Sequence, residues 1–317
     1  MEKRKLEENP RVIVNYKGDS DGPLLIVIGA LHGNEPVGVW AIQYLHKMLE
    51  VEPFTNPDFN FKGNFIGIIG NLKAYQLNER FINKDINRQW TPQHIDQIKI
   101  LDFASLDAED QEMIEVLDTI QEVIAEFKPK EMYILDVHTT SSDGGIFSIP
   151  APSDESFRIS KELHAPVVKG MTEGIGGTTL HYFNTQNFPI PTTAVTFEAG
   201  QHQDSKSVNR AIAAIINFMR TIQCVNSDDV ENIHDQILMD YSKDLPKVTE
   251  LILRYPVGPE DNFVMKPGYK NFQAVKKDEI LASNEEGNIL CPQDAFLLMP
   301  LYQKKGEDGF FLVKVLS

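Results

Sequence analysis

Short apolar segments alternate with amphipathic helical patterns up to about residue 222. The segments are rich in Val, Ile and Leu and are four to seven residues long, which is typical of buried strands rather than helices. They cover residues 12–16, 24–30, 64–70, 132–137, 145–148 and 192–198.

Three helices are predicted between these strands, because apolar residues recur every three or four positions. Alternating strands and helices indicate the α/β class, with a mixed, largely parallel sheet and helices on both faces. The helical stripes are Val37, Ala41, Tyr44, Leu45 and Met48; Met113, Leu117, Ile120, Ile124 and Phe127; and Val208, Ile212, Ile215, Met219 and Ile222.

The pattern changes after residue 222. A polar stretch over 225–244, part helix and part linker, precedes strand-like runs separated by turn signals such as NEEGN and KKGEDG. We therefore expect a catalytic domain over 1–222 and, over 223–317, a linker and a smaller C-terminal β-rich domain. The runs cover 248–255, 272–281, 295–302 and 310–316.

Composition narrows the functional classes. A net charge of −16 argues against nucleic acid and anionic membrane surfaces as partners, but a small anionic substrate stays possible. No apolar run reaches the ~20 residues of a spanning helix, and the N-terminus MEKRKLEENP lacks the apolar core of a signal peptide. The two cysteines, Cys224 and Cys291, form no metal-binding motif, so we expect a reduced, cytoplasmic protein whose metal ligands would be His and carboxylate.

Three predicted strands end in residues suited to metal chemistry. His32 and Glu35 follow the strand over 24–30, His138 follows 132–137, and Glu198 ends 192–198. In open α/β sheets, ligands bind beyond the carboxyl ends of the strands. These side chains are therefore predicted to meet at one edge of the sheet.

A catalytic zinc ion takes three protein ligands and leaves one position for water. His32, Glu35 and His138 are the candidate ligands, with Glu198 as a general base and Asp136 as support for a histidine. Each of these residues, taken alone, also has a structural interpretation, and a His-x-x-Glu pair is common by chance. Together at three strand ends they favour one metal site.

A second polar cluster follows the strand over 64–70. It contains Arg80 and Arg88, eight residues apart. Arginine binds carboxylates in a bidentate manner, so the pair is a candidate anion site. A solvated surface is the alternative for each arginine taken separately.

Four segments, in the same order, resemble the succinylglutamate desuccinylase and aspartoacylase family, which is related to zinc carboxypeptidases. They are GALHGNEPVG, NLKAYQLNERFINKDINRQW, LDVHTTSSDGG and TFEAGQH, and they span most of 24–202. The resemblance implies that His32, Glu35 and His138 bind one zinc ion per chain. It also implies that Glu198 activates the zinc-bound water.

The resemblance implies roles for four further residues. Arg80 would polarise the scissile carbonyl and stabilise the oxyanion. Asn87 and Arg88 would bind the carboxylate of the amino-acid part, and Tyr302 would reach into the pocket from the C-terminal domain. The activity implied is hydrolysis of the amide bond in a small N-acyl amino acid.

One departure concerns the substrate. Aspartoacylases carry another arginine about ten residues before the catalytic glutamate, where this chain has Phe188, and no arginine occurs between Ile159 and Arg210. Aspartate specificity is therefore in doubt. The neighbouring His181, Tyr182 and Asn184 are candidates for a less anionic pocket, or are loop residues.

Other functions fit the same motifs. A metallocarboxypeptidase acting on peptides would use the same ligands and carboxylate site. A non-catalytic zinc- or ligand-binding protein would need neither Glu198 nor Arg80, and a purely structural site would have four ligands rather than three. A site with two His and one Glu also accepts cobalt, nickel or manganese, and the sequence indicates no oligomeric state.

Overall fold

The structure is a computed structural model that describes residues 6, 9–18, 20–229, 233–258 and 260–316. The prediction that the N-terminus is not a signal peptide falls largely outside these residues, as do 230–232 of the predicted linker. No helix in the described ranges is both long and apolar enough to cross a membrane.

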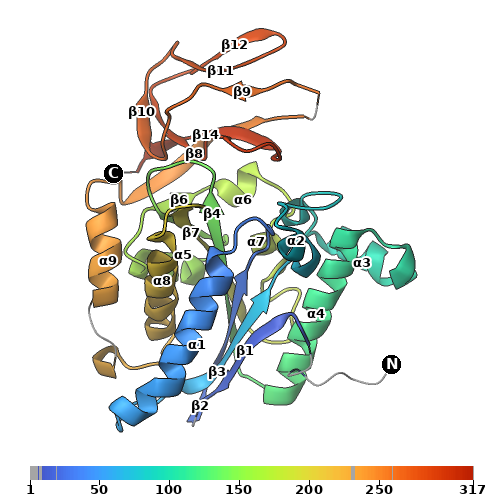
Figure 1. Cartoon of the computed structure of the whole chain (residues 1–317), viewed down its shortest axis with the longest axis vertical. Helices are drawn as coiled ribbons and strands as arrows, with labels where there is room; N and C mark the ends of the chain where they lie inside the picture. Colours follow the sequence, from blue (N-terminus) through green and yellow to red (C-terminus); the bar gives the residue numbers. More distant parts are fainter. Residues whose placement is uncertain (1–5, 7–8, 19, 230–232, 259, 317) are drawn as a thin grey trace.

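A large mixed sheet forms the centre of the molecule (Figure 1). Its central strands β3, β2, β4 and β7 are parallel neighbours, while β1, β5 and the C-terminal strands add antiparallel pairs. The predicted α/β class is confirmed. In spatial order the strands are β1 (Val12–Lys17), β3 (Lys62–Ile69), β2 (Ser20–Gly29), β4 (Met132–Thr140), β7 (Thr192–Gln201), β5 (Phe147–Pro150), β6 (Val167–Lys169), β8 (Val248–Pro256), β14 (Asp308–Val315), β13 (Ala295–Leu298) and β10 (Gln273–Val275).

Helices cover both faces of this sheet, and β2 shows why. Leu24, Ile26 and Ile28 pack in the cluster that contains α4, whereas Leu25 and Val27 pack in the cluster with α1 and α8, because successive strand side chains point to opposite faces. One face carries α1 (Val37–Thr55), α5 (Asp154–Glu162), α8 (Ser207–Thr221) and α9 (Ile233–Ser242); the other carries α2 (Leu72–Leu77), α3 (Pro92–Lys99), α4 (Ala108–Phe127), α6 (Met171–Gly174) and α7 (Thr179–Tyr182).

The three helices over 37–48, 113–127 and 208–222 are confirmed, but the stripe assigned to the first was partly wrong. Tyr44 and Met48 are 56% and 42% exposed. The buried side of α1 instead includes Ile42, Leu45 and Leu49. Tyr44 and Met48 belong with Trp40 and Val51 to a row of exposed apolar residues beside the buried face. Both rows have helical spacing, so spacing alone does not distinguish the exposed row from the buried one.

The C-terminal segment has both predicted and unpredicted strands. The run over 272–281 is divided between β10 and β11 (Ile280–Asn284), and β11 pairs with β9 (Val264–Met265) and β12 (Gly287–Leu290) in a small separate sheet (Figure 1). Part of this segment has a hydrophobic cluster of its own, whereas Cys224, Val225 and Leu238 pack in the cluster of α1 and α8. The boundary at residue 222 stays a prediction. Strand β8 of the same segment pairs with β6 and extends the main sheet.

A buried charge network fixes β1 against α4. Arg11 is fully buried, donates to Glu112 and Glu115 at 2.7 Å each, and also donates to the carbonyl oxygen of Ile69. Glu112 in turn accepts the backbone N–H of Leu72 at the start of α2. The segment that follows β3 is therefore tied to the sheet through charges.

We expect Arg11→Met to lower the free energy of unfolding by about 3–5 kcal/mol, because it leaves the buried Glu112 carboxylate without its cation. Urea denaturation measures this. Arg158→Met is the matched control: Arg158 pairs with Glu155 on the surface, so its loss should cost no more than about 1 kcal/mol. Equal effects of the two substitutions would contradict the assignment.

Candidate metal centre and pocket

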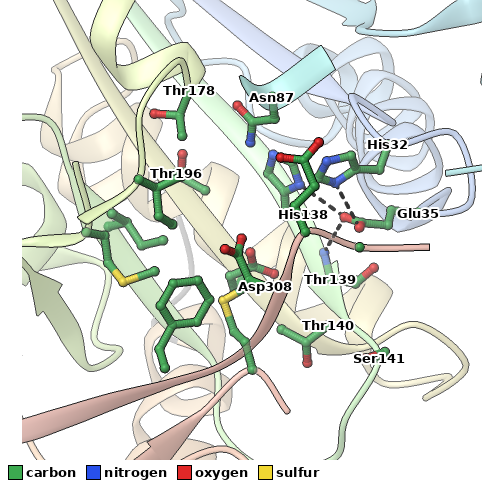
Figure 2. A pocket seen from close by; sticks show the side chains of 18 of the residues that line it. His32, Glu35, Asn87, His138, Thr139, Thr140, Ser141, Thr178, Thr196 and Asp308 are labelled. Carbon is green, nitrogen blue, oxygen red and sulfur yellow. Dashed lines mark hydrogen bonds and ion pairs between the residues drawn. The ribbon is translucent and has the colours of Figure 1, made fainter. Parts of the chain in front are cut away.

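Three potential ligands converge at the carboxyl ends of β2 and β4. His32 follows β2, Glu35 precedes α1 and His138 lies in β4, and one donor atom from each falls within 4.8 Å of the others. Nδ1 of His32 is 3.0 Å from Oε1 of Glu35, and Nδ1 of His138 is 3.0 Å from Oε2 of the same glutamate (Figure 2). Two imidazole nitrogens and a carboxylate are donors that zinc accepts, so the residues fit a divalent ion.

A tight turn after β2 makes this arrangement possible. The N–H of Glu35 donates to the carbonyl of His32 at 3.0 Å, which turns the chain back. Gly33 sits against α2, where a Cβ would lie 2.1 Å from the carbonyl carbon of Ala74. Only glycine therefore lets the turn approach α2 this closely.

Each histidine also faces a second carboxylate. Nε2 of His32 lies 3.1 Å from Oδ1 of Asp85, and Nε2 of His138 lies 3.0 Å from Oδ2 of Asp136 as an ion pair. Asp136 also accepts the Thr179 hydroxyl at 2.7 Å. Metal-binding histidines commonly have such a carboxylate behind them, which orients the ring. The partner of Asp136 is thus His138, two positions along the same strand.

The carboxylates of this cluster are negatively charged, which favours the binding of a metal cation. Burial alone would raise the pKa of Glu35, but the imidazoles of His32 and His138 hold this pKa well below its ordinary value. Burial would likewise raise the pKa of Asp85, and His32 together with Arg80 holds it well below the usual range. Both carboxylates are therefore anionic at neutral pH.

Glu198 lies beside these ligands. It is buried in β7, in register with His138 of β4, and its Oε2 has no hydrogen-bond partner among the described residues. Burial raises its pKa to about 8; the charges of Glu35 and Asp136 act in the same direction, while His138 and Arg80 oppose it. A carboxyl group with such a pKa can accept and return a proton near neutral pH.

Arg80 belongs to the same cluster. Its guanidinium donates to Oε1 of Glu35 at 3.1 Å and to Oδ2 of Asp85 at 3.0 Å. Burial lowers its pKa, but these two carboxylates outweigh burial and raise it, so the group stays charged. The loop before Asp85 is held by the buried Glu109, which accepts the N–H of Ile82 at 2.8 Å.

Asn87 and Arg88 lie in a short 3-10 turn, Ile86–Arg88, at the side of the pocket. Oδ1 of Asn87 accepts the N–H of Thr179 at 3.0 Å, which leaves its amide N–H groups for a ligand. Arg88 donates to the carbonyl of Asn87 at 2.7 Å and to Asp308 of β14, and Asp308 also accepts from Arg254. The link through Asp308 was not predicted.

The remaining sequence candidates lie elsewhere. The Tyr302 hydroxyl donates to the Lys266 carbonyl at 2.8 Å and accepts the N–H of Tyr269 at 2.8 Å, and Tyr302 is not among the residues that line the pocket. This geometry gives its predicted substrate role no support. His181, Tyr182 and Asn184 do not line the pocket either: His181 caps α7, and Tyr182 packs against Phe188 and Phe183.

The pocket opens to solvent, and its lining combines the candidate ligands with hydroxyl-bearing and apolar side chains. The segment between β13 and β14 forms one wall. Asn34 donates to Gln303 at 3.0 Å and Lys305 donates to the Phe81 carbonyl at 2.9 Å. The C-terminal segment therefore borders the metal centre directly.

The site lies within the region that matches a known family. The model of the succinylglutamate desuccinylase/aspartoacylase catalytic domain matches residues 21–222. A probable aspartoacylase from Nostoc sp. is 27% identical over 128 residues, 40% of this chain and 39% of that protein, so the match spans about two fifths of the relative's length.

Solved structures show the same fold. A succinylglutamate desuccinylase/aspartoacylase from Rhodobacter sphaeroides has a TM-score of 0.65 at 16% identity, covering 96% of this chain and 88% of that one. The product-bound ectoine utilization protein EutE (DoeB) from Ruegeria pomeroyi has a TM-score of 0.62 at 14% identity, covering 95% and 87%. With its catalytic-domain match over 21–222, this chain belongs to the succinylglutamate desuccinylase/aspartoacylase family.

Proposed function

We propose that this chain is a zinc-dependent hydrolase that cleaves the amide bond of a small N-acyl amino acid. One observation carries the proposal. Two histidines and a glutamate converge on one point, beside a buried carboxyl oxygen of Glu198 that has no hydrogen-bond partner in the part of the chain that the structure describes. His32, Glu35 and His138 would hold the zinc ion, which would supply Lewis-acid chemistry for the carbonyl and the attacking water.

The other side chains handle protons, charge and orientation. Glu198 takes the proton of the attacking water and returns it to the leaving nitrogen. Arg80 lies at Glu35, where its guanidinium can stabilise the negative oxygen that develops on the acyl carbonyl. Asn87 and Arg88 bind the substrate carboxylate. The Oδ1 of Asn87 is occupied by the N–H of Thr179, and Nε of Arg88 is buried without a hydrogen-bond partner among the described residues.

The pocket favours a small substrate over a peptide. The segment that carries Gln303 and Lys305 contacts the loops at the metal centre and limits the length of chain that fits. A metallocarboxypeptidase would need an open groove at this position. A non-catalytic binding protein would have no use for a buried carboxyl group with a raised pKa, as Glu198 has. The cytoplasmic location inferred from composition remains part of the proposal.

Zinc binding is the first expectation to test. Purified wild type should hold about one zinc ion per chain, and Glu35→Ala should lose most of it, as metal analysis can show. His94→Ala is the control, because His94 pairs with Asp110 outside the pocket. Chelation should abolish amine release and added zinc should restore it. Full zinc content in Glu35→Ala would refute the ligand assignment.

Glu198→Gln should slow amine release from N-acyl amino acids by about 10²–10⁴-fold, the usual contribution of general acid–base catalysis. The substitution keeps the side-chain shape, so zinc content should equal that of wild type. Steady-state kinetics and metal analysis on the same preparation separate the two effects. A rate within a few-fold of wild type would remove Glu198 from the mechanism.

Arg88→Ala should raise KM by about tenfold or more with a smaller change in kcat, because a charge-assisted bond to the substrate carboxylate is lost. Arg254→Ala is the matched control. Arg254 binds the same Asp308 but is not among the residues that line the pocket, so its KM should change less. Unchanged KM in Arg88→Ala would count against the carboxylate role.

A further inference from the structure

One wall of the pocket is made of hydrocarbon. Its residues come from β5, α6, α7, β14 and the connection between α6 and α7, and are only 1–8% exposed. They also belong to the main hydrophobic core, so the wall is rigid and preformed. In Figure 2, carbon and sulfur side chains lie on the side of the pocket away from the labelled His32 and Glu35. The wall residues are Ile149, Met171, Ile175, Leu180 and Phe311.

Met299 completes this wall from the C-terminal segment. It is partly buried against the same core and has a φ of 50°, a left-handed conformation that is uncommon for residues with a Cβ. Its N–H donates to Oδ1 of the buried Asn271 at 2.7 Å, and Asn271 donates to Thr140 at 3.0 Å. The network fixes the backbone of Met299, which is one of the residues that line the pocket.

Both arginines that line the pocket pair with protein carboxylates, and the proposed function uses each of them once, Arg80 for the oxyanion and Arg88 for one carboxylate. Among the described residues that line the pocket, Arg80 and Arg88 are the only basic ones apart from the histidines. Arg80 binds Glu35 and Asp85, and Arg88 binds Asp308. With Arg88 assigned to one substrate carboxylate, no basic residue of the lining is left for a second one.

Given the proposed function, on which the inference rests, we infer that the wall is a subsite for an uncharged, apolar substituent of a substrate with a single carboxylate. A second carboxylate against this hydrocarbon would lose its hydration without gaining a partner. A side-chain ammonium against this hydrocarbon would meet the same cost, because the lining carboxylates Asp308 and Glu307 both lie at Arg88, and Asp308 also pairs with Arg254. The substituent is either the amino-acid side chain or a long acyl chain.

Wild type, loaded with zinc, is tested on two series that separate these sources. N-acetyl-leucine, -methionine and -phenylalanine extend the side chain, whereas N-hexanoyl-glycine extends the acyl group. We expect kcat/KM at least about tenfold above N-acetyl-glycine in one series, since each buried methylene group adds to affinity. N-acetyl-aspartate, N-succinyl-glutamate and Nα-acetyl-lysine should be the poorest substrates. A preference for any of these charged compounds would overturn the inference while leaving the proposed function in place.

Met299→Gln tests the wall with a side chain of nearly the same shape. The ratio of kcat/KM for the favoured apolar substrate to that for N-acetyl-glycine should fall about fivefold or more. Met48→Gln is the matched control, because Met48 is exposed on α1 and the ratio should not change. An unchanged ratio in correctly folded, zinc-loaded Met299→Gln would remove this residue and weaken the wall assignment.

Binding to Glu198→Gln, measured by calorimetry, does not depend on turnover. Either N-acetyl-leucine or N-hexanoyl-glycine should bind at least about tenfold more tightly than N-acetyl-aspartate. If wild type releases amine from no compound, the proposed function fails, and this comparison still decides the inference. Tighter binding of N-acetyl-aspartate than of both apolar compounds would overturn it.

Discussion

The buried carboxylate of Glu35 is the group on which the site depends. Removing a carboxylate from water is expensive unless it is paired and hydrogen-bonded. Glu35 meets this condition only when His32, His138 and Arg80 all reach it, together with the N–H of Thr139 at 3.1 Å. These partners come from separate parts of the chain, so one desolvated charge determines how the turn after β2, the strand β4 and the loop before α3 must meet.

The same reasoning applies where the C-terminal segment joins the site. Asp308 is largely buried and binds Arg88 from the pocket and Arg254 from β8. The orientation of Arg88 therefore depends on β8 and β14 being in place. Strand β8 also extends the main sheet through β6. The C-terminal segment therefore supplies part of the pocket and also holds Arg88 in position.

Local patterns predicted much of this structure, and long-range pairing explains most of what they missed. The strands that end near His32, His138 and Glu198 are apolar runs followed by polar residues, a signal contained within a few positions. Asp308 carries no such signal, because its partner Arg88 lies 220 residues away. The predicted role of Tyr302 rests on the resemblance alone, and its hydroxyl binds backbone groups near β9.

The residues proposed to carry out the reaction and those proposed to select the substrate lie in different parts of this fold. Sequence motifs identify only the first group. The ligands and Glu198 lie at strand ends, where polar residues in an apolar context stand out. Wall residues such as Leu180 and Phe311 are indistinguishable in sequence from other core positions, because they pack into the core and also face the pocket. For the proposed hydrolase, family membership does not give the substrate, so substrate choice has to be argued from the charges and hydrocarbon that surround the candidate metal site.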